Sequence, residues 1–338
     1  MNYSKLFFIC LIFLASLVTS CKKENKSTTK TPNIDVKILT DKAIRKGELK
    51  IYPIINLSSA QNNDHLIFAE ALKNRGFNIR RSIQGQGIYT IGQLNRNTLN
   101  FANKSNVSSL LLFGDIAQAS NEIFIAQESR EIPAKKITEI NFISINRTGY
   151  NQTEGISLKP LFPCPPTPLR NLLHNKPQLT INWLQEALPL LGFPIQNELK
   201  THEMDLNLFE KNKIEEQSDR IPQEHLGELE DFLQRFSPIA QDNQAIGCLV
   251  TYQDTILISY IFAQANLFKK EWPYISTSIY LNQLMGYRPT EMQSFRPFVN
   301  TETSASHIQT LWKKNRVLAK DDAYRGEWDG VPFYLVWF

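Results

Sequence analysis

The stretch AIGCLVTYQDTILISYIFAQANLFKKEWPYISTSIYLNQLM, residues 245–285, indicates the fold class of this chain. Two runs of aliphatic and aromatic residues, 245–252 and 255–262, flank Gln253-Asp254, and this arrangement predicts two paired strands joined by a tight turn. Over Leu267–Met285 the apolar residues recur at helical spacing, which predicts a long amphipathic helix. A hairpin followed directly by such a helix is typical of a domain that mixes both kinds of element.

The segments on either side extend this C-terminal half. Leu226–Phe236 carries a helical apolar stripe, and Ser306–Lys314 is a further helix candidate. Gly326–Gly330 has the composition of a hairpin turn, which we expect between strands at Val317–Tyr324 and Val331–Phe338. The last six residues are too apolar for a tail, so we predict a buried terminal strand.

The N-terminal half is predicted to be rich in strands. Leu49–Ile55 is the first strand candidate, and a helix with Asp64 as its N-cap and Gly76 as its stop follows. Short runs with partial alternation then predict six strands: Phe77–Ile83, Tyr89–Leu94, Leu99–Ala102, Leu110–Phe113, Glu122–Ala126 and Ile137–Ile145.

Between these halves, the sequence predicts a connector over 151–225. Five prolines between Pro160 and Pro168 argue against regular structure there. One helix is expected over Leu179–Leu188, and the polar segment Glu198–Arg220 reads as an exposed insertion. The predicted fold class is therefore α+β.

We expect the two halves, 46–150 and 226–338, to pack on each other, because each presents apolar faces that the other can cover. The chain before them divides into a signal segment, 1–20, and a flexible tether, 21–45.

The N-terminus has the features of a secretion signal. Lys5 precedes the uncharged run Leu6–Val18, whose 13 residues are too few to cross a bilayer core, which takes roughly 20. Val18-Thr19-Ser20-Cys21 resembles the bacterial lipoprotein box, which implies cleavage before Cys21 and a lipid on that cysteine. The alternatives are an uncleaved anchor and a signal that is cleaved without lipidation.

A lipid on Cys21 would place the chain on a bacterial membrane, and we expect the outer membrane, with the periplasmic and surface faces both open. Lys23-Glu24 is similar to the surface-export signals of some lipoproteins, although Asn25 departs from them. The formal net charge of +4 is too small and too scattered to predict nucleic-acid binding.

Apart from Cys21, the mature chain contains two cysteines, Cys164 and Cys248. They could form one disulfide or remain as two buried thiols, and we favour the thiols; their spacing matches no zinc motif. The sequence contains no Gly-x-Ser-x-Gly elbow, no His-Glu-x-x-His helix and no P-loop, and its five histidines are scattered. We therefore expect neither a metal nor a cofactor.

Two stretches resemble the domain family associated with ADP-ribosylglycohydrolases and rhodanese-phosphatases. The first is Leu110–Asp115, an aliphatic strand followed by a glycine and an acidic residue, with Asn121-Glu122 where that family has Lys-Gln. The second is Asp242–Gly247. In that family a strand pair, Leu-Phe, Trp and Ser-Tyr come next in this order, and this chain has a predicted hairpin followed by Leu267-Phe268, Trp272 and Ser278-Ile279-Tyr280.

The resemblance implies no established activity. It leaves Asp115, Glu122 and Gln244 as the candidate polar site, with hydrogen bonding in turns and at strand ends as the simpler explanation of these residues. The loss of the family's lysine favours a non-catalytic protein that binds an envelope partner or a small ligand. The alternative is a lipid-anchored, hydrolase-like enzyme that acts on a polar or phosphorylated small molecule, and a structural part of an envelope complex is a third possibility.

Overall fold

The computed structural model describes residues 34–58, 65–81, 94–119, 122–146, 156–187, 223–286, 295–328 and 331–338. These residues lie in one compact unit, Pro32–Phe338. Its helices are α2 (Phe68–Lys73), α3 (Pro166–Leu173), α4 (Pro177–Ala187), α6 (Gln223–Phe236), α7 (Ala265–Leu284) and α9 (Thr301–Lys313). The strands are β1 (Val36–Ile38), β2 (Ile44–Lys46), β3 (Leu49–Asn56), β4 (Leu66–Ile67), β5 (Phe77–Arg81), β6 (Leu94–Asn103), β7 (Ser109–Leu111), β8 (Asp115–Ala119), β9 (Glu122–Ala126), β10 (Arg130–Ile132), β11 (Ile137–Asn146), β12 (Lys159–Pro163), β13 (Ala245–Tyr252), β14 (Thr255–Phe262), β15 (Arg296–Pro297), β16 (Ala323–Trp328) and β17 (Val331–Trp337).

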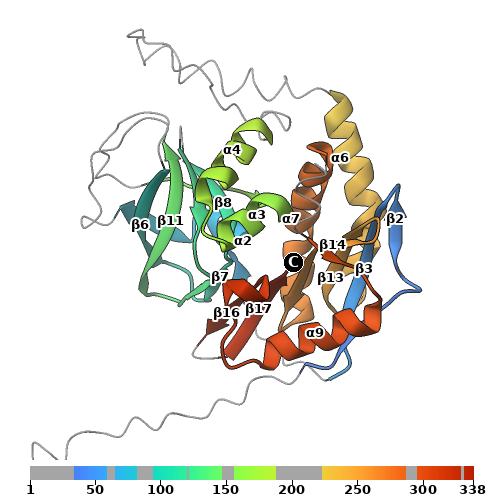
Figure 1. The fold of residues 1–338 in the computed structure, drawn as a ribbon. Helices are drawn as coiled ribbons and strands as arrows, with labels where there is room; N and C mark the ends of the chain where they lie inside the picture. Colours follow the sequence, from blue (N-terminus) through green and yellow to red (C-terminus); the bar gives the residue numbers. More distant parts are fainter. Residues whose placement is uncertain are drawn as a thin grey trace, which may run out of the picture. The chain divides into compact units, whose positions relative to one another are not determined.

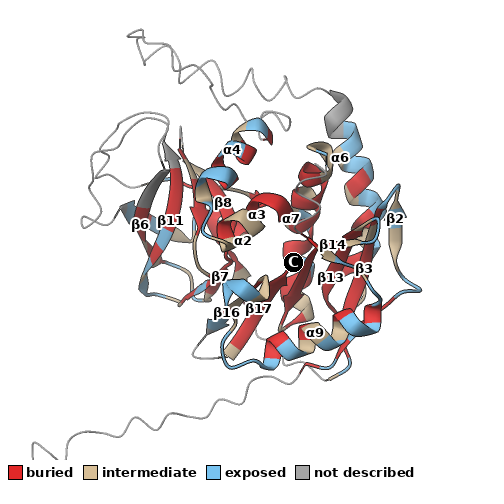
Figure 2. Cartoon of the chain, in the orientation of Figure 1, coloured by how far each residue is buried: buried red, intermediate tan, exposed pale blue. Residues whose placement is uncertain are grey.

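The C-terminal half is built on an eight-stranded sheet with the order β1-β3-β13-β14-β17-β16, to which β2 and β15 add at the sides. The predicted hairpin is present as β13 and β14, with Gln253 in the left-handed conformation at its turn. Both faces of this sheet are buried, as Figure 2 shows. Helix α7 packs against β13 on one face, while α9 packs against β1 and β17 (Figure 1).

The N-terminal half holds a six-stranded sheet with the order β12-β8-β9-β11-β6-β5, and a small sheet β10-β7-β4. Alternate residues of β8 show how the two halves join. Ala117 packs in a core that belongs to the N-terminal half, with Phe101 and Phe124. Its neighbour Ile116 packs in a larger core shared with Phe268 and other residues of the C-terminal half. The expected α+β fold, with a strand-rich half packed on hairpins and amphipathic helices, is therefore confirmed.

The tether predicted over 21–45 is longer than the structure allows. Ordered structure begins within 21–45, where β1 and β2 pair with β3. Val36 and Ile38 are buried, and Lys37 between them is exposed. This alternation is a strand signal, but it covers only three residues and its charged neighbours obscured it.

The prolines of 160–168 do not prevent regular structure, so that prediction was wrong. Strand β12 tolerates Pro160 and Pro163 because it is an edge strand that pairs only with β8, where a missing N–H costs little. Helix α3 begins at Pro166. A proline fits this position because the first N–H groups of a helix have no partner within the helix, so its missing N–H breaks no bond. The expected helix over 179–188 is present as α4, so this part of the connector holds two helices.

One strand was missed and another was misplaced. We had predicted no strand at β8, which lies between β12 and β9 in the six-stranded sheet. The strand expected at Val317–Tyr324 begins only at Ala323, because a 3-10 turn at Ala319–Asp321 precedes it. The N-cap prediction at Asp64, most of the Tyr89–Leu94 strand and the insertion Glu198–Arg220 lie outside the described residues.

The terminal strand and the cysteines agree with prediction. Phe338 and the residues of β17 after Val331 are buried. Cys164 and Cys248 are both free and buried, as favoured over a disulfide. Within the described ranges, no helix has the length and apolar character to cross a membrane.

Candidate functional site

The position of Asp115 is fixed by a turn that begins at Leu112. Gly114 adopts φ +88°, as the third residue of a type II turn requires, and the Asp115 N–H donates to the Leu112 carbonyl at 3.0 Å. In return the Leu112 N–H donates to Oδ2 of Asp115 at 2.8 Å. A Cβ at Gly114 would lie 2.4 Å from Cδ1 of Leu169, so this turn also depends on close packing. The result is a carboxyl group held in the interior.

A second carboxyl group enters the same region from α7. Glu271 is only 4% exposed and lies on the apolar face of this helix, beside Phe268 and Trp272. It lines one pocket with Asp115, and no hydrogen bond or ion pair joins its carboxyl group to a residue of the described ranges. The other lining residues are Phe68, Ala69, Ile116, Pro160, Leu161, Phe162, Pro163 and Tyr274. This pocket is partly open and has room for about one water molecule.

The two carboxyl groups favour protonation. Burial raises the pKa of Asp115 to about 7, although the Leu112 N–H opposes this effect. Burial also raises the pKa of Glu271 well above its usual range, and the negative charges of Asp115 and Glu70 add to this rise. Because the groups interact, their protons belong to the pair, which retains a proton at neutral pH.

The nearest lysines are already engaged. Lys270 lies 3.4 Å from Oε2 of Glu70 and donates to the carbonyl of His65 at 2.8 Å. Lys73 donates to the hydroxyl of Tyr274 at 2.7 Å and lies over its ring. Burial raises the pKa of Tyr334, which lies on the inner side, and the charges of Asp115 and Glu271 add to this rise. Among the described residues, the lining of the pocket therefore carries no positive charge of its own.

The other two predicted site residues lie elsewhere. Glu122 is buried at the start of β9 and pairs with Ala119, the far end of β8 from Asp115. Asp115 and Ala119 are four positions apart along β8, which corresponds to about 13 Å. Gln244 is exposed ahead of β13; its N–H donates to Asp242 at 2.9 Å and its carbonyl accepts from Asn56 at 3.2 Å. The structure does not bring the three together, and Gln244 has the turn role named as the simpler explanation.

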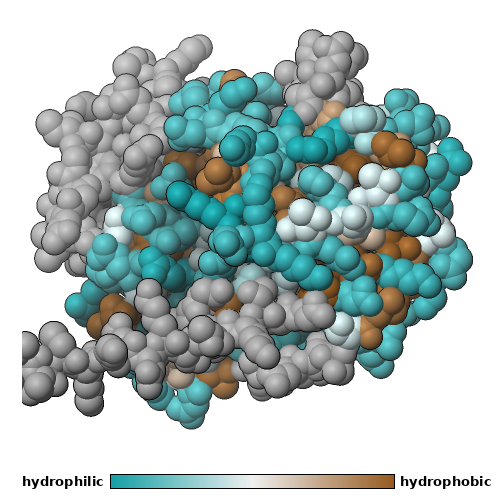
Figure 3. Space-filling model, turned by 60° about the horizontal axis from the view of Figure 1, so that its bottom comes forward, coloured by the Kyte–Doolittle hydropathy of each residue, from teal (hydrophilic) through white to brown (hydrophobic). Residues whose placement is uncertain are grey.

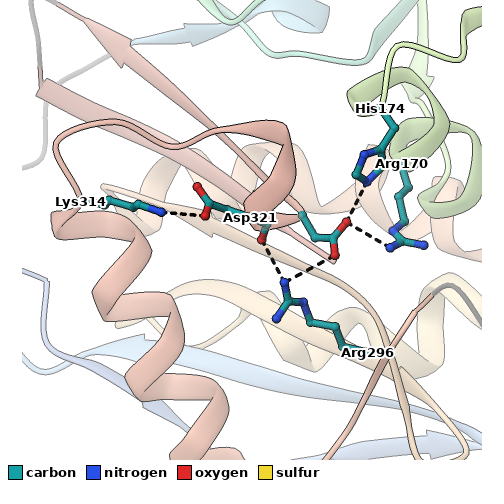
Figure 4. A network of polar contacts seen from close by, with 6 residues as sticks. Arg170, His174, Arg296, Lys314 and Asp321 are labelled. Carbon is teal, nitrogen blue, oxygen red and sulfur yellow. Dashed lines mark hydrogen bonds and ion pairs between the residues drawn. The ribbon is translucent and has the colours of Figure 1, made fainter.

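A second polar cluster surrounds Asp322, between α3, β15 and β16 (Figure 4). Its Oδ1 accepts from Nη2 of Arg170 at 3.1 Å and lies 2.7 Å from Nε2 of His174, and Arg296 approaches Oδ2 at 3.5 Å. Asp322 has φ +52°, and its carbonyl accepts the N–H of Phe338 at 2.9 Å. These contacts tie three distant segments together, so we interpret the cluster as structural.

Comparison with known proteins identifies no family for this chain. No protein-family model, curated protein or solved structure matches this chain. The resemblance drawn from Leu110–Asp115 and Asp242–Gly247 stays a prediction, and the argument about function depends on the chain's own residues.

Sequence reasoning found Asp115 but missed its partner. A signal was present: Glu271 follows Leu267 by four positions and Phe268 by three, so it falls on the apolar stripe of the predicted helix. A carboxylate on such a stripe is rarely left buried without a partner or a function. The second acid can be found from the sequence, whereas its proximity to Asp115 depends on tertiary packing.

Proposed function

We propose that this chain is a lipid-anchored protein of the bacterial cell envelope that binds a ligand at the Asp115–Glu271 pocket without catalysing its conversion. The observation that carries the proposal is a pair of buried carboxyl groups that share one partly open pocket. Burial raises the pKa of both groups, and a buried pair of this kind that lines a pocket is a candidate functional site.

A binding role is favoured over catalysis by what lines the pocket. Apart from the two acids and Tyr274, the described residues that line it are apolar, and they include no serine, cysteine, histidine or lysine. The space holds about one water molecule, which admits a ligand's head group but not a substrate with an attacking water beside it. Asp115 and Gln244, whose convergence in one cleft would have favoured an enzyme, lie apart in the structure.

A hydrolase-like enzyme is the second candidate, because two acids with different proton affinities can act as a general acid and a general base. A phosphorylated substrate is disfavoured, because the described residues that line the pocket include no lysine or arginine to hold its phosphate. A structural role in a larger complex is less favoured. The exposed large apolar residues of the described ranges are Leu57, Ile137, Leu179, Val299 and Leu318, and apolar residues form separate patches on the face shown in Figure 3.

The anchor is proposed from Leu6–Cys21 alone. A Cys21→Ala variant should lose acyl labelling and leave the membrane fraction, or accumulate as precursor. Acyl labelling that persists in this variant would refute lipidation at Cys21.

The binding proposal is tested by a small-molecule screen that follows the thermal unfolding midpoint of the purified protein. Hits should lose their effect in Glu271→Gln and keep it in Glu302→Gln, which changes an exposed carboxylate on α9. Turnover of chromogenic ester, phosphate or glycoside substrates that disappears in Glu271→Gln would instead establish the enzyme.

A further inference from the structure

We propose that the pocket between α2, β8, β12 and α7 binds a primary ammonium group, held between the carboxylates of Asp115 and Glu271. This inference rests on the proposed binding function and names the ligand chemistry of the same site. The ammonium group could belong to a lysine of a partner protein or to a small free amine.

The first argument is a missing partner. Glu271 is 96% removed from solvent, it faces the pocket, and no described residue hydrogen-bonds to its carboxyl group. Buried carboxylates in folded proteins are nearly always paired or hydrogen-bonded. The groups that face the pair from the neighbouring elements are Glu70 of α2, Tyr274 of α7 and Tyr334 of β17. None of these groups carries a positive charge. The nearest lysines, Lys270 and Lys73, are engaged by other groups, so a cation for the carboxyl pair would come from outside the described residues.

The second argument separates an ammonium group from a metal ion. The described residues contain no group of three or more His, Cys, Asp or Glu side chains that could hold a metal. Ca²⁺ takes six to eight oxygen ligands, and Mg²⁺ takes six, of which several are usually waters. The pocket offers two carboxylates and room for about one water molecule, which is too little for either shell. An ammonium group is satisfied by two carboxylates and has about the size of the one water molecule that fits.

The third argument concerns the walls. Phe68, Phe162 and the prolines at 160 and 163 surround the two acids with apolar surface. Such walls suit the methylene groups next to the charged tip of a lysine or an alkylamine, and the rest of the stem would extend through the open side of the pocket. The pocket therefore matches the two parts of one ligand, an apolar stem and a charged tip.

Binding should displace protons. Burial and mutual repulsion keep a proton on the pair at neutral pH, and a cation between the groups favours the ionised form of both. We therefore expect binding to release at least one proton and to strengthen as the pH rises from about 6 to about 8.

The test is calorimetric titration of the purified full chain with n-butylammonium chloride, in two buffers of different ionisation enthalpy. n-Butanol is the matched ligand control, since it has the same stem without the charge, and MgCl₂ and CaCl₂ are titrated separately. We expect saturable binding of n-butylammonium with proton release, and no binding of n-butanol or of either metal. Glu271→Gln and Asp115→Asn should each weaken binding by at least about tenfold, and Glu302→Gln should leave it unchanged.

A lysine-containing peptide distinguishes the two sources. Binding of the peptide much tighter than that of n-butylammonium indicates a protein partner, and equal binding indicates a small amine. The inference is overturned if n-butylammonium does not bind, if Glu271→Gln binds it equally well, or if a divalent ion binds in its place. Ligands other than amines that lose their effect in Glu271→Gln would overturn this inference and leave the proposed function standing.

Discussion

The carboxyl pair predicts that stability falls as the pH rises toward neutrality. Asp115 has an ordinary pKa near 3.8 and a pKa of about 7 in the folded protein. Between these values the folded state keeps a proton that the unfolded state has lost, so the free energy of unfolding decreases with pH. Its contribution is complete below about pH 4 and is lost as the pH passes about 7. A rise of about three in the pKa corresponds to about 4 kcal/mol, and the raised pKa of Glu271 contributes in the same direction.

Asp115→Asn removes this dependence while keeping the turn, because the amide oxygen can still accept the Leu112 N–H. The variant should gain stability relative to the parent protein between about pH 4 and 7, by up to about 4 kcal/mol. Denaturant unfolding at a series of pH values measures this difference.

Asp242→Asn is the control, because its ion pair with Lys42 lowers the pKa of Asp242 and gives the opposite, smaller trend. A parent protein and Asp115→Asn with parallel stability curves across this range would refute the reasoning.

The other predictions concern the framework. Gly114→Ala should destabilise the fold by roughly 2–4 kcal/mol, measured by denaturant unfolding, because it strains a residue at φ +88° and crowds Leu169; a loss below about 0.5 kcal/mol would contradict this account of the turn. Asp322→Ala should cost roughly 1–3 kcal/mol in the same assay by leaving Arg170 and Arg296 without their shared carboxylate, and an unchanged midpoint would argue against a structural role. Deletion of 333–338 should abolish cooperative thermal unfolding, since each large buried side chain contributes about 1.5–3 kcal/mol; cooperative melting near the parent temperature would contradict it.

The long elements were predictable because their patterns are strong and local. The β13–β14 hairpin and α7 were found within a few residues of their observed bounds. Short elements failed where neighbours decide the outcome. Strand β8 follows a turn that depends on Gly114 and on packing against Leu169, and β1 exists because β3 offers an edge. The prolines of β12 are compatible with a strand only at a sheet edge, which the local sequence does not reveal.

The candidate site was half predictable for a related reason. Asp115 follows an aliphatic run and a glycine, so its place at a turn can be read from the sequence. Its pairing with Glu271 joins positions 156 residues apart, and it depends on the packing of α7 against both β13 and β12. Glu122 and Gln244 were grouped with Asp115 through the family resemblance. The register of the β8–β9 hairpin places Glu122 at the opposite end of β8 from Asp115.

The most direct test of the central claim is the protonation state of the two carboxyl groups at neutral pH. Infrared spectroscopy of the folded protein, compared with Glu271→Gln and Asp115→Asn, detects the carbonyl stretch of a buried protonated carboxyl group. We predict that the parent protein shows this band at pH 7 and that it weakens as the pH rises to about 8 and when n-butylammonium is added. The absence of a protonated-carboxyl band at pH 7, or a band that persists unchanged in both variants, would contradict the account.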